Sequence, residues 1–197
     1  MSRVVEVPSQ LDEGGFEELV ASLNEAAPPD AGEEEGAGGR ILLDARRVRW
    51  VSPYGLVGLL AVGQVARDRT GLAPAIERPE SQDVRSYWER MEFWKSAAGV
   101  FQIPSLSTRS HRDSDALLEI TPIRSHHDVH QVVERVRERS AAILESRLSY
   151  PKPAVIQFSV MLSEVCQNIL EHAGAAGWVC AQTYHWKKRL GRDVVVL

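Results

Sequence analysis

Three polar side chains in the last quarter of the sequence have the types and the spacing of a binding site. Glu164, Asn168 and His172 recur every four residues within residues 158–173, FSVMLSEVCQNILEHA. In an α-helix a step of four residues rotates by only ~40°, so this spacing places the three groups on one face. A carboxylate and an amide oxygen suit a hard cation such as Mg²⁺. The pattern therefore predicts a helix that carries a cation-binding stripe.

The ordinary alternative is that these residues form the solvated side of an amphipathic helix. Two features favour the site instead. The stripe contains no Lys or Arg, which are the usual residents of a solvated face. The stripe is also short-chained and of mixed type, with oxygen ligands at its centre that suit a hard cation. We further expect the apolar remainder of the helix to be buried, and polar groups are costly to bury unpaired. The residues expected to be buried are Phe158, Val160, Met161, Leu162, Val165, Cys166, Ile169 and Leu170.

The run SEVCQNILEHA resembles the N-box helix of the GHKL ATPases, the superfamily of histidine kinases, Hsp90-type chaperones and bacterial anti-sigma factor serine kinases. The family pattern of Glu, Asn and then His or Lys at intervals of four, followed by a small residue, falls on Glu164, Asn168, His172 and Ala173. The resemblance implies ATP and Mg²⁺ as cofactors, with Asn168 holding Mg²⁺ against the phosphates. It also implies that Glu164 is catalytic and polarises the water or hydroxyl that attacks the γ-phosphate. His172 would lie near the phosphates.

The flanking segments follow the order of the first half of a GHKL domain, which is a helix, the N-box helix and an antiparallel hairpin. Apolar residues recur at helical spacing over residues 127–148, and Ser125 or Asp128 is the candidate cap of that helix. After the N-box-like helix, residues 178–186 and 193–197 are strand-like and are separated by a polar turn. The context therefore strengthens the resemblance.

The adenine side of such a nucleotide site has no counterpart in the sequence. In the family the hairpin leads into an Asp-x-Gly-x-Gly turn that binds the adenine amino group, and no such run occurs here. We therefore expect residues 123–197 to form only the N-box half of a histidine kinase/Hsp90-like ATPase domain, as in a truncated protein. Weak ATP affinity is expected, because phosphate-side residues cannot recognise the base. The uncovered side of a half domain also predicts self-association, such as a homodimer, or dependence on a partner.

Residues 1–122 predict a small α/β sandwich, because strand-like and helix-like segments alternate along them. The fold class is therefore α/β (α+β), with the incomplete second domain joined near Pro122. The acidic run 28–39 predicts a flexible loop. The expected strands are residues 3–7, 41–44, 73–77 and 117–120, and the expected helices are residues 16–23, 56–66 and 84–94.

The segment ILLDARRVRWVSPYGLVGLLAVGQVAR resembles a STAS domain, the fold of the anti-anti-sigma factors. In that family an apolar strand ends in Asp, and a phosphoacceptor Ser or Thr precedes the glycine that opens a Leu- and Gly-rich helix. Asp44 and Gly55 match this pattern, whereas Tyr54 occupies the phosphoacceptor position, so phosphoswitching stays open. We interpret the neighbouring Ser52 as a helix N-cap rather than as a phosphorylation site. The resemblance implies a sigma factor or an anti-anti-sigma-like antagonist as the protein partner.

Composition and charge argue against other classes of protein. The net charge of −4 gives no electrostatic basis for binding nucleic acid, and Arg46, Arg47 and Arg49 are interpreted as solvated loop residues. The sequence has no signal peptide and no apolar span of 18 residues, so we expect a cytoplasmic protein that does not enter a membrane. Cys166 and Cys180 are too few for a disulfide scaffold and are predicted to be buried thiols.

A pair of histidines offers a different kind of site. His126 and His130 are four residues apart at the start of a predicted helix and could bind a metal ion. No third ligand is well placed, since Asp128 points elsewhere on that helix. Surface histidines are therefore the simpler interpretation, and a metal-dependent hydrolase lacks a sufficient ligand set.

The combined hypothesis is an ATP-binding signalling regulator of the anti-sigma factor, partner-switching serine-kinase type, with an incomplete nucleotide site. The alternative is a non-catalytic protein-interaction module in which both domains present surfaces to a partner. A complete form would be an ATPase or serine kinase, and we expect this chain alone to be inactive.

Overall fold

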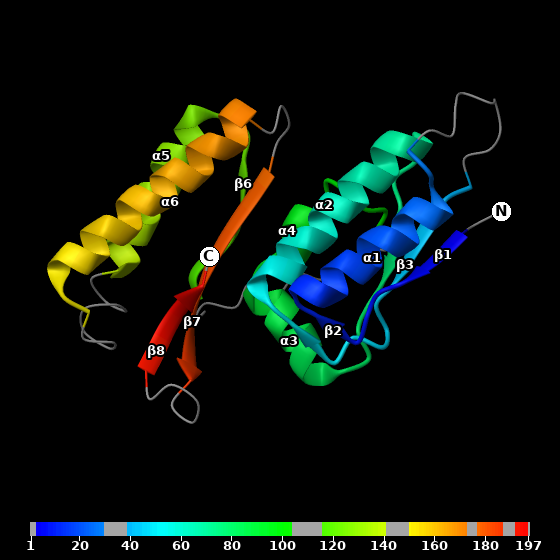
Figure 1. Ribbon diagram of the computed structural model, residues 1–197, viewed down its shortest axis with the longest axis horizontal. Helices are drawn as coiled ribbons and strands as arrows, with labels where there is room; N and C mark the ends of the chain where they lie inside the picture. The colour runs from blue at the N-terminus through cyan, green and yellow to red at the C-terminus, as the bar shows by residue number, and fades with distance from the viewer. Residues whose placement is uncertain are drawn as a thin grey trace. The chain divides into compact units, whose positions relative to one another are not determined.

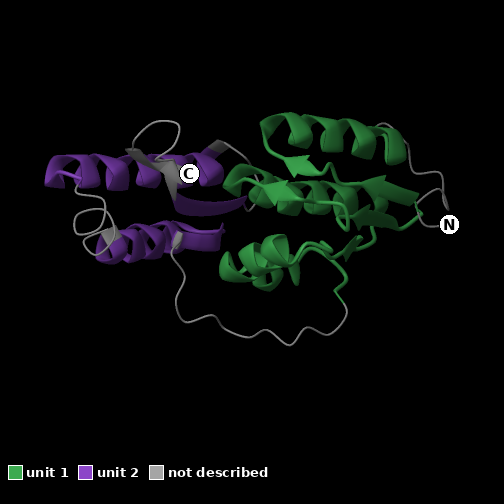
Figure 2. Ribbon diagram, turned by 90° about the horizontal axis from the view of Figure 1, so that it is seen from below, with its two compact units in different colours: residues 1–112 green, residues 113–197 purple. Residues whose placement is uncertain are grey.

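The chain consists of two compact units, residues 1–112 and 113–197 (Figure 2). The computed structural model describes residues 3–29, 39–103, 116–140, 150–172, 177–186 and 192–196. Helices and strands occur in both units, so the fold is mixed α/β, as predicted (Figure 1). Most of the acidic run 28–39, for which a flexible loop was predicted, lies outside the described residues.

Unit 1 is built on a three-stranded parallel sheet with the order β1-β3-β5. The register pairs Glu6 with Asp44 and Asp44 with Glu77, so each strand ends in a carboxylate at the same level. Burial alternates along the strands, because side chains point to opposite faces of a sheet. The strands are β1 (Arg3–Glu6), β3 (Ile41–Asp44) and β5 (Ala75–Glu77), with a second parallel pair formed by β2 (Gln10–Leu11) and β4 (Trp50–Val51).

Two long helices, α1 and α2, lie side by side in unit 1 (Figure 1). The helices of this unit are α1 (Glu13–Ala26), α2 (Pro53–Thr70), α3 (Gln82–Arg90) and α4 (Phe93–Ala97). Helix α2 is apolar on most of its circumference, and its Leu56, Leu59 and Leu60 are fully buried. Glycines allow its close packing, since a Cβ on Gly58 would lie 2.6 Å from the Phe16 ring.

The segment predicted as one helix over residues 84–94 is two short helices. The chain breaks between α3 and α4 at Glu92, whose φ of 53° is left-handed. This conformation interrupts a helix, because L-residues with a side chain adopt it only as isolated positions. The aromatic anchors predicted in the segment are buried: Trp88 packs against Phe93 and Trp94 with ring centroids 4.5 Å and 5.4 Å away.

Unit 2 combines an antiparallel sheet with two helices that contact each other and the sheet. Its elements are β6 (Ala116–Ile123), α5 (His126–Ser140), α6 (Lys152–His172), β7 (Gly177–Trp186) and β8 (Arg192–Val196), with the strand order β6-β7-β8. The core contains Leu117 and Leu118 from β6, Val132 from α5, and Leu162 and Cys166 from α6.

Strand β6 belongs to unit 2. From the sequence, residues 117–120 were predicted to belong to the first domain, with the junction near Pro122. The strand pairs with β7 and packs against α5, so the division between units falls before it. Strand pairing links residues far apart in sequence, which local patterns do not reveal. The predicted helix 127–148 is described as far as Ser140, and residues 141–149 lie outside the described residues.

A buried carboxylate on β6 forms an ion pair with the last turn of α5. Glu119 is 7% exposed, and its Oε2 accepts a hydrogen bond of 2.7 Å from Arg139 NH1. A charge inside a strand is tolerated when it is paired, because an isolated buried charge is costly. This ion pair was not predicted from the sequence.

Candidate functional site

The helix predicted to carry the site is present as α6, which spans 21 residues. Its N-terminus follows Pro151, and Pro153 lies in the first turn, where a missing backbone N–H does not disturb the helix. Val155, Leu162 and Cys166 are buried and attach one side of the helix to the core of unit 2. The opposite side of the helix is exposed.

Glu164 and Asn168 lie on that opposite side, and both are exposed. They are one helical turn apart, or roughly 6 Å along the axis. Within the described part of the chain, neither side chain forms a hydrogen bond or an ion pair. His172 is the last residue of α6, but its side chain lies outside the described residues. The structure thus brings together two of the three predicted site residues.

The surroundings of this stripe differ from the prediction. Val160, Met161 and Val165 were expected to be buried, but they are 57%, 49% and 39% exposed. Ile156, one turn before Val160, is 64% exposed. Helical periodicity explains the difference, because these residues fall on the same half of the helix as Glu164 and away from the core. The polar stripe therefore lies within an exposed, mainly apolar helix face.

The donor set on α6 is small but chemically suited to Mg²⁺ on a phosphate. Mg²⁺ prefers oxygen ligands and usually takes only one or two from the protein, with phosphate oxygens and water supplying the rest. Asn168 offers one amide oxygen, and Glu164 offers a carboxylate one turn away. Among the residues that the structure describes, no group of three or more His, Cys, Asp or Glu side chains is placed to hold a metal ion.

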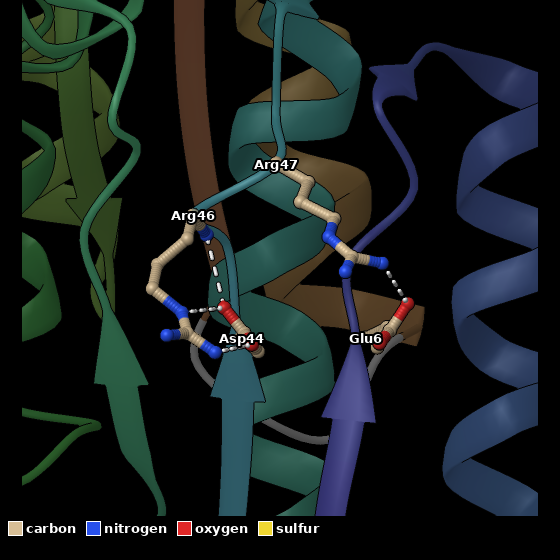
Figure 3. Close-up of polar contacts among 4 residues, drawn as sticks. All are labelled: Glu6, Asp44, Arg46 and Arg47. Carbon is tan, nitrogen blue, oxygen red and sulfur yellow. Dashed lines mark hydrogen bonds and ion pairs between the residues drawn. The ribbon is translucent and has the colours of Figure 1, made fainter.

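A second polar cluster lies at the carboxyl ends of β1 and β3 (Figure 3). Arg46 donates from Nε and NH2 to the two carboxylate oxygens of Asp44 at 2.9 Å and 2.6 Å, and its backbone N–H donates at 3.1 Å. These hydrogen bonds from Arg46 hold the pKa of Asp44 below its usual value. Arg47 pairs with Glu6 at 3.5 Å. The arginine cluster is exposed, as predicted, and two of its members are neutralised by strand-end carboxylates.

A pocket of about 770 Å³ lies beside these strand ends. Arg46, Glu77 and Arg78 contribute to its lining, together with Trp94, over whose ring the Arg78 guanidinium lies at 5.2 Å. Ligands of α/β proteins commonly bind at the carboxyl ends of parallel strands. This pocket was not predicted, although the charged residues that follow two predicted strands were a usable signal.

Ser52 is the N-cap of α2, as predicted. It is 8% exposed, its Oγ accepts a 3.0 Å hydrogen bond from Gly55 N, and it donates at 3.3 Å to the carbonyl of Leu11. The Ser52 hydroxyl therefore serves to cap the start of α2. Tyr54 is exposed and packs edge-on against Phe16, with ring centroids 5.3 Å apart.

The other residues considered in the sequence are the two cysteines and three residues at the start of α5. Cys166 and Cys180 are buried thiols, as predicted, and burial raises their pKa values to about 11 and about 12. His126 and His130 are exposed. Asp128 accepts hydrogen bonds from Arg124 N and Ser125 Oγ at 2.9 Å and 3.0 Å, which lower its pKa and close the start of α5.

Comparisons with protein-family models, curated proteins and solved structures find no match to this chain. Within the described ranges, no helix is both long enough and apolar enough to cross a membrane.

Proposed function

We propose that the chain is a cytoplasmic, ATP-binding signalling regulator of the anti-sigma factor, partner-switching type. Its nucleotide-binding residues lie on α6, where Asn168 holds Mg²⁺ against the phosphates and Glu164 is the catalytic carboxylate. His172 lies near the phosphates. The observation that carries the proposal is the exposed pair Glu164 and Asn168, one turn apart on α6. The order of α5, α6, β7 and β8 adds support, because it is the order that the GHKL resemblance implies.

The side chains divide the chemistry between them. When bound, ATP supplies the γ-phosphoryl group, and Mg²⁺ offsets the negative charge of the phosphates. Asn168 would contribute one neutral oxygen ligand to the Mg²⁺ that accompanies the phosphates. Glu164 accepts a hydrogen bond from the attacking water or hydroxyl and draws its proton away as attack proceeds.

Unit 1 supplies the partner-binding role in this proposal. A parallel sheet, the N-cap Ser52 and the Leu- and Gly-rich helix α2 support its STAS-like character. Because the Ser52 hydroxyl is committed to capping, Tyr54 is the exposed hydroxyl at the start of α2. The expected partner is a sigma factor or an anti-anti-sigma-like antagonist.

A non-catalytic interaction module is the second candidate function. It is favoured by the four large apolar side chains exposed on α6, because a water-facing helix seldom exposes so many unless another surface covers them. In that case Glu164 and Asn168 contact a protein rather than a nucleotide.

Isothermal titration of the full chain with Mg-ATP separates the two candidates. The nucleotide proposal expects saturable heat that is lost with EDTA and is lost in Asn168→Ala. Gln157→Ala is the matched control, because it removes an exposed amide from the same helix roughly 16 Å along the axis. Absence of heat at millimolar Mg-ATP supports the interaction module, whereas equal binding by Asn168→Ala contradicts the proposed role of Asn168.

The role of Glu164 has its own test. Glu164→Gln should retain Mg-ATP binding and lose any phosphate release or phosphoryl transfer that the wild type shows, because the amide cannot accept a proton. Glu171→Gln, at another exposed glutamate of α6, should leave both properties unchanged. Equal effects of the two substitutions would contradict a catalytic role for Glu164.

A further inference from the structure

The pocket at the strand ends of unit 1 has an aliphatic floor on one face of the parallel sheet. Leu42 pairs with Ala75 in the register of β3 and β5, and Glu77 lies two residues beyond Ala75. Because side chains two residues apart on a strand point to the same face, these three share one face of the sheet. All three line the pocket. A ligand held here therefore lies on apolar side chains with a carboxylate at one end.

The wall of the pocket is a short segment between β5 and α3 that hydrogen bonds hold in place. Glu80 N donates to the carbonyl of Arg46 at 3.0 Å. Arg85 NH1 donates to the carbonyls of Pro79 and Glu80 at 3.1 Å and 3.0 Å. Its NH2 donates to Gln82 Oε1 at 2.6 Å. The wall is thus formed without a ligand, so binding costs little ordering of this segment.

The three guanidinium groups of the pocket differ in how far their donors are used. Arg46 is bonded to both carboxylate oxygens of Asp44 (Figure 3). Arg85 is bonded to the wall itself. Arg78 lies over the ring of Trp94 at 5.2 Å, and within the described ranges its N–H groups have no hydrogen-bond acceptor. Arg78 is therefore the guanidinium that keeps all its donors for a ligand.

Two carboxylates of the pocket are also unpaired. In the part of the chain that the structure describes, the exposed side chains of Glu77 and Glu80 form no hydrogen bond and no ion pair. Both lie near Arg46, whose pKa is raised mainly by its hydrogen bonds to Asp44 and further by the charges of these two carboxylates. Together with Arg78, the unpaired groups of the pocket are two negative charges and one positive charge.

We propose that this pocket binds a free basic amino acid of the arginine or lysine type. Such a molecule carries two positive charges and one negative charge, which complement the three unpaired groups. Its two cationic groups pair with Glu77 and Glu80, and its carboxylate accepts hydrogen bonds from Arg78. Its aliphatic stem lies over Leu42 and Ala75. The pocket volume of about 770 Å³ accommodates an amino acid together with bridging water.

An anion is the alternative ligand, since three arginines line the pocket. Phosphate or a dicarboxylate would lie beside Glu77 and Glu80, where like charges repel. It would also compete with protein acceptors for the donors of Arg46 and Arg85. The pattern of unpaired charges therefore favours the basic amino acid.

Isothermal titration of the full chain with L-arginine at low salt tests the site. We expect saturable one-to-one binding. L-citrulline should bind at least about tenfold more weakly, because it replaces the guanidinium with a neutral urea group of nearly the same shape. Equal binding of the two ligands overturns the proposal, as does the absence of saturable heat with millimolar L-arginine or L-lysine. Tighter binding of inorganic phosphate than of L-arginine overturns it as well.

Matched substitutions locate the bound ligand. The double substitution Glu77→Gln and Glu80→Gln should raise the Kd for L-arginine at least about tenfold, since it removes both negative charges and keeps the side-chain length. Glu89→Gln is the control, because Glu89 is an exposed glutamate of α3 and is not among the residues that line this pocket. Circular dichroism confirms that each variant is folded. Equal affinity of the double variant and the control overturns the proposal.

The contact with Arg78 is tested by a change in the ligand. Agmatine is arginine without its carboxylate, so it keeps both cationic groups and offers Arg78 no acceptor. Arg78→Gln should weaken the binding of L-arginine at least about threefold and should not weaken that of agmatine. Equal weakening of both ligands indicates a disturbed Trp94 wall and overturns the proposed orientation. The site belongs to unit 1, so these outcomes are independent of nucleotide binding at α6.

Discussion

Replacing Gly55 with alanine tests how tightly the start of α2 is fixed against β2. An alanine Cβ at this position would lie 2.1 Å from the carbonyl oxygen of Leu11 and 2.9 Å from its carbonyl carbon. The same carbonyl accepts hydrogen bonds from Ser52 N at 3.0 Å and from Ser52 Oγ at 3.3 Å. Because the obstacle is backbone that is already hydrogen-bonded, it cannot rotate away as a side chain could.

The expected cost follows from opposing contributions. Alanine improves helix propensity by up to ~1 kcal/mol over glycine. Relieving a 2.1 Å contact requires the start of α2 to move, which loosens the cap and the hydrogen bonds to Leu11, at ~1 kcal/mol each. Overpacking of the buried contact adds ~1–3 kcal/mol. The net expectation is a loss of about 3–5 kcal/mol of unfolding free energy.

Two other glycines provide an internal scale. A Cβ on Gly58 would meet ring carbons of the half-buried Phe16 at 2.6 Å, and this ring can shift, so Gly58→Ala should cost no more than ~1.5 kcal/mol. A Cβ on Gly14, in the first turn of α1, would lie 3.6 Å from Asp12 Oδ1, which is ordinary contact. Gly14→Ala should therefore be neutral or stabilise by ~0.5–1 kcal/mol.

Hydrogen exchange read out by mass spectrometry is the suitable assay, because it reports the opening of unit 1 separately from unit 2. Peptides from α2 should lose protection most in Gly55→Ala, less in Gly58→Ala and not at all in Gly14→Ala. If Gly55→Ala were as well protected as Gly14→Ala, the close approach of α2 to the Leu11 carbonyl would be refuted.

Three further predictions concern the cap, the strand-end ion pair and the thiols. Ser52→Ala should cost ~1 kcal/mol in urea unfolding, because Gly55 N loses its acceptor; an unchanged midpoint would contradict the capping role. Since Arg46 lowers the pKa of Asp44, their pairing stabilises the fold above the unfolded pKa of ~3.9 and is lost as the pH falls through the lower folded value. Asp44→Asn should therefore flatten the dependence of Tm on pH in that range, whereas an unaltered profile would argue against the pair. Cys166 and Cys180, with pKa values of about 11 and about 12, should not react with a disulfide reagent at pH 8 until the chain is unfolded in urea, and rapid reaction of the native protein would contradict their burial.

Local patterns were sufficient for much of the fold. The apolar run 41–44 and the helix that follows Ser52 have local signals, a short β-type run and an N-cap, and both occur as predicted. Glu92 carries no such signal, so the break between α3 and α4 was not foreseen. The membership of β6 in unit 2 depends on pairing with β7, more than 50 residues away, which no local pattern encodes.

For the candidate site as well, local features were predicted correctly and features that depend on packing were not. Helical periodicity is a local property, so it correctly placed Glu164 and Asn168 on one face. Exposure depends on what packs against the helix, so Val160 and Met161 were wrongly expected to be buried. The alignment of Glu6, Asp44 and Glu77 at one end of the sheet depends on strand register, which the sequence does not reveal before the pairing is known.

The most direct test of the nucleotide proposal is to locate the bound metal relative to α6. Mn²⁺ replaces Mg²⁺ at oxygen sites and broadens the NMR signals of nearby nuclei. With Mn-ATP added to the full chain, the side-chain amide signal of Asn168 should broaden strongly, while that of Gln157, roughly 16 Å along the helix, should broaden far less. Equal broadening of the two signals, or none at millimolar Mn-ATP, would contradict the account.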